Sequence, residues 1–178
     1  EDGRADPVTT SPSLRAANQP PPLENYDLFS GDRALVEAFR REGSTAREDE
    51  CAAFGRLCGG EPLELGRLAN ENPPVLKRDD EVEFHPAWHE LLGLGVEHGL
   101  HAFPWLDAEP GAHVARATKF MTLAYAEAGV GCPLSMTYAA VPALRADPEL
   151  AAEWEPLLGA RSYEPGLRPV GEKRGALV

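Results

Sequence analysis

Two histidines, His85 and His89, stand four positions apart, a spacing that places both side chains on one face of a helix. With the neighbouring Glu90 they resemble a zinc-binding pair. The residues between them are Pro-Ala-Trp, however, so the His-Glu-x-x-His order of a zinc protease is absent. Proline is common in the first turn of a helix, which favours a structural role at a helix N-terminus for both histidines. The other histidines have no spaced partner and are expected on the surface or satisfied in the core: His98, His101 and His113.

The three cysteines, Cys51, Cys58 and Cys132, are odd in number, and none belongs to a Cys-x-x-Cys pair. A disulfide framework or a zinc site is therefore not expected. Cys51 and Cys58 stand seven positions apart and would share a face of one helix, so we predict that the cysteines are small core residues. Ser135 and Ser162 lack the Gly-x-Ser-x-Gly context of a nucleophilic serine. The glycine-rich phosphate-binding motifs are also absent, so the sequence contains no visible catalytic constellation.

One segment, Gly131 to Ala140, combines small, soft and hydroxyl-bearing side chains. The helix predicted over 133–144 is apolar almost all round, which predicts that it is buried. A surface of this kind suits a cavity that accepts a flat ring or an acyl chain. Ordinary helix packing, in which small residues let two helices approach closely, explains the same composition. The residues alone leave both interpretations open.

The elements that must position this segment are helices, and the sequence predicts an all-α fold with six or seven of them. Capping residues, glycines and prolines delimit the apolar-periodic stretches. A brief extended piece is expected within 75–84, and residues 23–30 are expected to form an arm docked by its aromatic groups. The helices are predicted from Ser30 or Asp32 to 42, from Ser44 or Thr45 to 57, and over 62–69, 86–94, 113–128, 133–144 and 148–158.

The strongest helical pattern follows Gly111 and extends over about 18 residues, rich in alanine. Such a helix is expected to be central and tightly packed. Its apolar face is predicted from spacings of three and four. The residues of that predicted face are His113, Val114, Ala117, Phe120, Met121, Ala124, Tyr125 and Ala128.

Composition limits the classes of function. The formal net charge of −12 argues against contact between this chain and nucleic acid, because phosphate binding needs clustered Lys and Arg. No apolar run approaches the roughly 20 residues that a membrane span needs, and residues 1–19 lack the pattern of a secretion signal. We therefore expect a soluble, cytoplasmic protein. Residues 1–22 are predicted to be an extended or disordered arm.

The C-terminal residues Glu172 to Val178 are typical of a charged turn followed by the first residues of a buried strand. A strand without a partner leaves backbone donors and acceptors unpaired. The expectation is therefore a chain that stops at a domain junction, with a helical domain over 23–170 and the start of a truncated β-domain over 171–178.

Five ordered blocks of the sequence form a recognisable series that spans about residues 18–178. The blocks are Asn18 to Leu23 with Asn25 and Leu28, Leu63 to Asn70 with Asn72 to Pro74, Glu83 to His89, Glu127 to Pro133 with Met136, Thr137, Ala139 and Ala140, and Lys173 to Gly175. Each block alone is a weak signal, but together they resemble the N-terminal helical region of the acyl-CoA dehydrogenase family, specifically its AidB-like, alkylation-response branch. The turn at 77–80 is shorter than the family usually has, either truly or because residues are missing there.

The resemblance implies a three-part, FAD-containing and typically tetrameric enzyme that removes two hydrogens from an acyl thioester. The helical domain would be followed by a β-domain and a C-terminal helical bundle on the same or a separate chain. The flavin-binding stretch and the catalytic base would lie in those missing parts, so no catalytic residue is assigned in this segment. The resemblance places a wall of the substrate or flavin pocket at Ser135, Met136, Thr137 and Tyr138.

The alternative is an alkylation-response protein associated with DNA in which flavin is mainly structural. Its DNA-binding surface would have to lie in the missing C-terminal part, because this segment is acidic. A third possibility is a stand-alone helical interaction module. That possibility is disfavoured because the apolar helix over 133–144 and the terminal strand both need partners.

Overall fold

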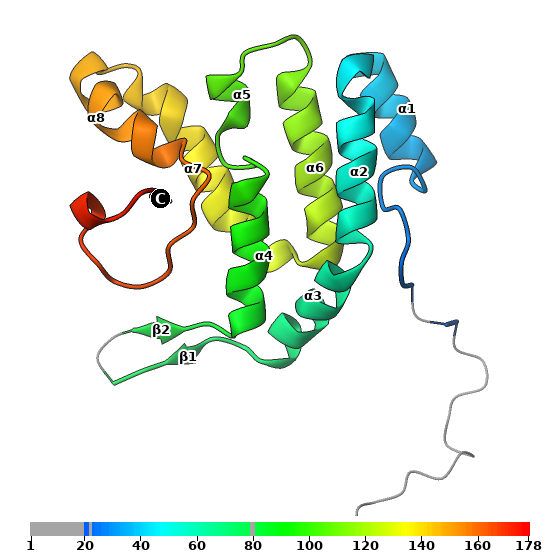
Figure 1. The fold of residues 1–178 in the computed structure, drawn as a ribbon, viewed down its shortest axis with the longest axis horizontal. Helices are drawn as coiled ribbons and strands as arrows, with labels where there is room; N and C mark the ends of the chain where they lie inside the picture. Colours follow the sequence, from blue (N-terminus) through cyan, green and yellow to red (C-terminus); the bar gives the residue numbers. More distant parts are fainter. Residues whose placement is uncertain (1–19, 22, 79–80) are drawn as a thin grey trace, which may run out of the picture.

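A computed structural model describes residues 20–21, 23–78 and 81–178, and within them the fold is helical, as predicted. Figure 1 shows the helices side by side, with one small two-stranded hairpin below α4. The prediction for 1–22 falls almost entirely outside the described residues. The elements are α1 (Arg33–Glu42), η2 (Thr45–Arg47), α2 (Glu48–Cys58), α3 (Glu61–Glu71), β1 (Val75–Leu76), β2 (Val82–Glu83), α4 (Pro86–Glu97), α5 (Phe103–Leu106), α6 (Ala112–Ala126), η3 (Ala128–Val130), α7 (Gly131–Leu144), α8 (Pro148–Leu158) and η4 (Val170–Glu172).

Short-range chemistry explains where the helices begin. The side chain of Asp32 accepts a hydrogen bond from the Leu35 backbone N–H at 3.0 Å and so caps α1. Asp147 caps α8 in the same way. α4 begins at Pro86, and its cap is His85, whose Nδ1 accepts from the Ala87 backbone N–H at 3.2 Å. The predicted structural role of His85 is confirmed.

Two apolar clusters form the core. The first joins α2, α4, α6 and α7, and the second joins α1, α2, α5 and α6. The arm before α1 enters both clusters through Leu28 and Phe29, which are 4% and 1% exposed. The predicted docking by aromatic groups is confirmed for Phe29 but not for Tyr26, which is 39% exposed. α6 packs along α2, α3 packs on α4, and α7 pairs with α8 (Figure 1).

The central position predicted for α6 is confirmed, but the predicted apolar face is wrong. Met121 and Tyr125 are 51% and 53% exposed. The buried face carries small and polar side chains, because α2 approaches α6 closely and other elements supply partners for the long charged side chains. That buried face consists of Ala112, Ala115, Arg116, Thr118, Lys119, Thr122 and Leu123.

The prediction that α7 is buried on all sides is also wrong for the described residues. Leu134, Thr137 and Val141 are buried along one side of the helix. On the opposite side Met136 is 49% exposed, and Cys132 is exposed as well. An apolar composition indicates that a helix needs a partner, but it does not say that the partner lies within these residues.

Of the three cysteines, Cys51 and Cys58 are core residues, as predicted, and Cys132 is not. Burial raises the pKa of the Cys51 and Cys58 thiols to about 12, which keeps both in the neutral form. No helix among the described residues is long and apolar enough to cross a bilayer.

Candidate functional site

The four residues predicted as a pocket wall lie on different sides of α7. Successive residues on an α-helix are rotated by about 100°, so four in a row cannot share one face. Thr137 is fully buried, Met136 is half-exposed, and Ser135 and Tyr138 are intermediate. Ser135 and Tyr138 are three positions apart and so share one flank of the helix.

Thr137 connects α7 to the C-terminal segment. Its Oγ1 donates to the Pro133 carbonyl at 2.8 Å and accepts from the Val178 backbone N–H at 3.0 Å. The Ala176 N–H donates to the Leu157 carbonyl at 3.0 Å, so the segment is held across both α7 and α8. Residues 173–178 are not part of a strand here, and their assignment to a β-domain stays a prediction.

A pocket of about 300 Å³ lies between α4, the beginning of α7 and the C-terminal loop. Leu92, Val96 and Leu177 supply apolar walls, and Tyr163 brings a phenol. None of the four predicted wall residues lines this pocket.

The Tyr163 hydroxyl lies 2.6 Å from Nδ1 of His89. Burial raises the pKa of Tyr163 to about 12 and lowers the pKa of His89, so both groups are neutral near pH 7. His89 therefore contacts Tyr163 while His85 caps α4, and the two histidines do not converge on one ligand. Among the described residues, no group of three or more His, Cys, Asp or Glu side chains is placed to hold a metal ion.

Tyr138 belongs to a polar and aromatic cluster between α5, α6 and α7. Its hydroxyl lies 2.5 Å from Nδ1 of His113, and its backbone carbonyl accepts from the Trp105 indole N–H at 2.8 Å. The Arg116 guanidinium lies over the Tyr138 ring, 4.2 Å from its centroid. No sequence pattern links Arg116 to Tyr138, although an arginine in the middle of an alanine-rich helix expected to be buried is itself a signal.

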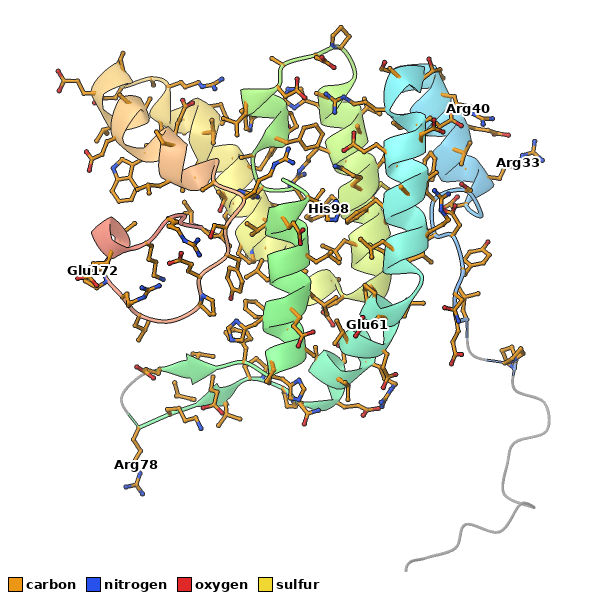
Figure 2. The ribbon with its side chains drawn as sticks, viewed as in Figure 1. Arg33, Arg40, Glu61, Arg78, His98 and Glu172 are labelled. Atoms are coloured by element: carbon orange, nitrogen blue, oxygen red, sulfur yellow. The ribbon has the colours of Figure 1, made fainter. Side chains whose placement is uncertain are left out.

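A second cluster, formed by charged side chains, lies where α6 meets α2. Lys119 is 2% exposed, and its Nζ donates to Glu50 at 2.6 Å and to the His98 carbonyl at 3.3 Å. His98 lies at the end of α4 (Figure 2). Burial opposes ionisation of Glu50, but the hydrogen bond and charge of Lys119, with help from Arg47, lower its pKa.

Comparison with known proteins gives the chain its family. The model of the Adaptive response protein AidB N-terminal domain matches residues 18–165. A protein of Escherichia coli (strain K12), "Putative acyl-CoA dehydrogenase AidB", is 46% identical over an alignment of 172 residues, and the match covers 90% of this chain and 32% of that protein. The chain thus spans about a third of the length of this relative.

Two solved structures share the fold. The apo form of Bd2924 superposes with a TM-score of 0.65 at 23% identity, over 78% of this chain and 30% of its own. Caenorhabditis elegans ACDH-11 in complex with C11-CoA gives a TM-score of 0.68 at 21% identity, over 82% and 28%. Because the family model matches most of the chain and agrees with its helical architecture, the chain belongs to the family of AidB N-terminal domains.

Proposed function

We propose that this chain is the N-terminal helical domain of a flavin-dependent, acyl-CoA dehydrogenase-like oxidoreductase. The complete protein would act on a CH–CH bond of an acyl thioester or a related substrate. The observation that carries this proposal is membership of the AidB N-terminal domain family, with a 46% identical relative named as an acyl-CoA dehydrogenase. The flavin-binding residues and the catalytic base are proposed to belong to parts of the protein outside these 178 residues.

Within that protein, α7 is proposed to form one wall of the substrate or flavin pocket. Met136 supports this role because its thioether is half-exposed on an apolar side of the helix. Ser135 and Tyr138 lie on the neighbouring flank, where Ser135 offers a hydroxyl group and Tyr138 a ring whose hydroxyl contacts His113. Thr137 is turned inward to Val178, so its proposed part is to hold the C-terminal segment against the wall.

The residues of α7 fit a part of a flavin site and not a whole one. A flat ring needs an apolar surface with a few polar groups, which α7 offers. A pyrophosphate needs clustered backbone amides or cations, and the sequence has no glycine-rich motif for it. A bound flavin would supply hydride acceptance, while the residues described here would orient the substrate and exclude water.

The visible absorption spectrum of the complete purified protein tests the proposal. A flavin spectrum near one flavin per chain is expected, together with loss of absorbance when an acyl thioester is added without oxygen. A complete protein that contains no flavin would refute the proposed function.

Two methionines with nearly equal exposure test the location of the wall. Met136 on α7 is 49% exposed, and Met121 on α6 is 51% exposed. Met136→Ala is expected to raise the KM for the thioester or shift the flavin spectrum, because it removes part of the wall. Met121→Ala serves as the matched control, and an equal effect of both variants would place the wall elsewhere.

The family resemblance implies a homotetramer. Light scattering of the complete protein measures its oligomeric state. Contact of this chain with DNA finds no support, because its net charge is −12. A salt-dependent gel shift with the complete protein would assign any such contact to its other parts.

A further inference from the structure

Arg116 is a buried cation with an incomplete set of partners. Only 8% of the residue is exposed, and its Nε donates to the Leu100 carbonyl at 2.7 Å. Its guanidinium lies between two rings, 4.6 Å from the centroid of Phe120 and 4.2 Å from that of Tyr138. Nη2 is buried and has no hydrogen-bond partner. Burial lowers the pKa of Arg116, which means that the surroundings disfavour its charge.

Two other cations among the described residues, Lys119 and Arg47, have little exposed side-chain surface, and both have carboxylate partners. Lys119 contacts the Glu50 carboxylate at 2.6 Å, and Arg47 contacts three carboxylates. None of the ion pairs among the described residues includes Arg116. Stacking on aromatic rings returns less free energy than the desolvation of an ion costs. The site therefore lacks one negatively charged group.

The groups around Arg116 also favour an anion. His113 is exposed, and its Nδ1 is engaged by the Tyr138 hydroxyl, while its Nε2 has no partner among the described residues. Arg145 lies 5.9 Å from the Trp105 ring centroid and carries its own carboxylate partner, so it adds no free positive charge. An incoming anion would first meet the exposed His113 imidazole and would have to reach the buried Nη2 of Arg116.

We propose that Arg116, with His113 beside it, forms a binding site for an oxyanion, a phosphate or carboxylate group of a small molecule. The planar guanidinium binds such groups through parallel N–H bonds, and Nη2 is a donor without an acceptor. The aromatic rings of Phe120 and Tyr138 hold the guanidinium in place before the anion arrives. This site shares Tyr138 with the wall proposed on α7, but anion binding there does not depend on the flavin and thioester chemistry proposed above.

Thermal unfolding of the complete protein in different salts tests the site. Sodium phosphate and sodium acetate are each compared with sodium chloride at equal ionic strength and pH. An oxyanion that binds the folded state is expected to raise the Tm by about 2 °C or more. This increment is expected to disappear in Arg116→Gln and to shrink in His113→Gln.

Arg33→Gln is the matched control, because it removes the same charge from a side chain on the outer face of α1 (Figure 2). General salting effects act on every variant alike, so only the difference between Arg116→Gln and Arg33→Gln counts. The separate measurements with phosphate and with acetate show whether the site binds a phosphate group, a carboxylate group or both.

A crystal of the unchanged protein soaked in selenate gives a second measurement that needs no variant. An anomalous peak beside the Arg116 guanidinium is expected. No peak there, together with equal salt responses of all variants, would overturn the proposal. A structure of the complete protein in which a protein carboxylate already contacts Arg116 would overturn it as well.

Discussion

Arg116 and Lys119 are three positions apart on α6 and are 8% and 2% exposed, yet their surroundings differ. On the α2 side, Lys119 is neutralised by Glu50 and hydrogen-bonded to the His98 carbonyl. On the α7 side, Arg116 contacts two aromatic rings and one carbonyl, without a carboxylate. The difference separates a cation that has a carboxylate partner from one that has none among the described residues. The α2 side is a structural contact, and the α7 side has the features of a binding surface.

The largest expected effect concerns His101, a buried group near Arg116 and Arg161. Its Nε2 donates to the Ala160 carbonyl at 3.1 Å, and its Nδ1 is buried without a partner. Burial, with a smaller contribution from the two arginines, lowers its pKa to about 4. Because the folded state binds this proton less readily than the unfolded state, whose pKa is about 6.5, its stabilising contribution is complete above pH 6.5. That contribution is lost as the pH falls from 6.5 to about 4.

The expected loss is about 3 kcal/mol, from 1.36 kcal/mol per pKa unit. Urea unfolding of the unchanged protein and of His101→Gln at pH 7, 5.5 and 4 measures it. As the pH falls, the unchanged protein should lose more stability than His101→Gln does. A constant difference across this range would mean that His101 is not held neutral by its surroundings.

The next largest effect tests the ion pair between Lys119 and Glu50. Glu50→Gln should destabilise the fold by about 2 kcal/mol, because it leaves Lys119 buried without a negative partner. The estimate is below that for a fully buried pair because Glu50 is 43% exposed. Chemical unfolding measures the loss. The double variant Glu50→Gln with Lys119→Met should recover most of it, and failure to recover would show that the pairing is not the cause.

The sequence predicted the all-α class and the positions of the longer helices because caps, prolines and glycines act locally, but it did not predict the four-residue α5. Of the two starts predicted for the first helix, Asp32 is the observed cap, and α4 begins at Pro86, as predicted. The buried face of α6 could not be predicted, because the burial of Lys119 depends on Glu50, which lies 69 positions away along the chain. The candidate site was assigned to a continuous run on α7, whereas Tyr138 contacts groups of α5 and α6. Only tertiary structure brings His113, Arg116 and Trp105 together at that residue.

The smallest expected effect concerns Arg116, and it distinguishes this unpaired cation most sharply from the paired Lys119. In chloride buffer, Arg116→Met should change the free energy of unfolding by less than about 1 kcal/mol. It removes an unpaired charge that is costly to bury and retains an apolar side chain between Phe120 and Tyr138. Lys119→Met, at the paired position, leaves Glu50 without its nearest cation and should cost more. Urea unfolding of both variants gives the comparison. If Arg116→Met costs as much as Lys119→Met or more, the aromatic rings and the Leu100 carbonyl already compensate the Arg116 charge, and the α7 side of α6 is as complete as the α2 side.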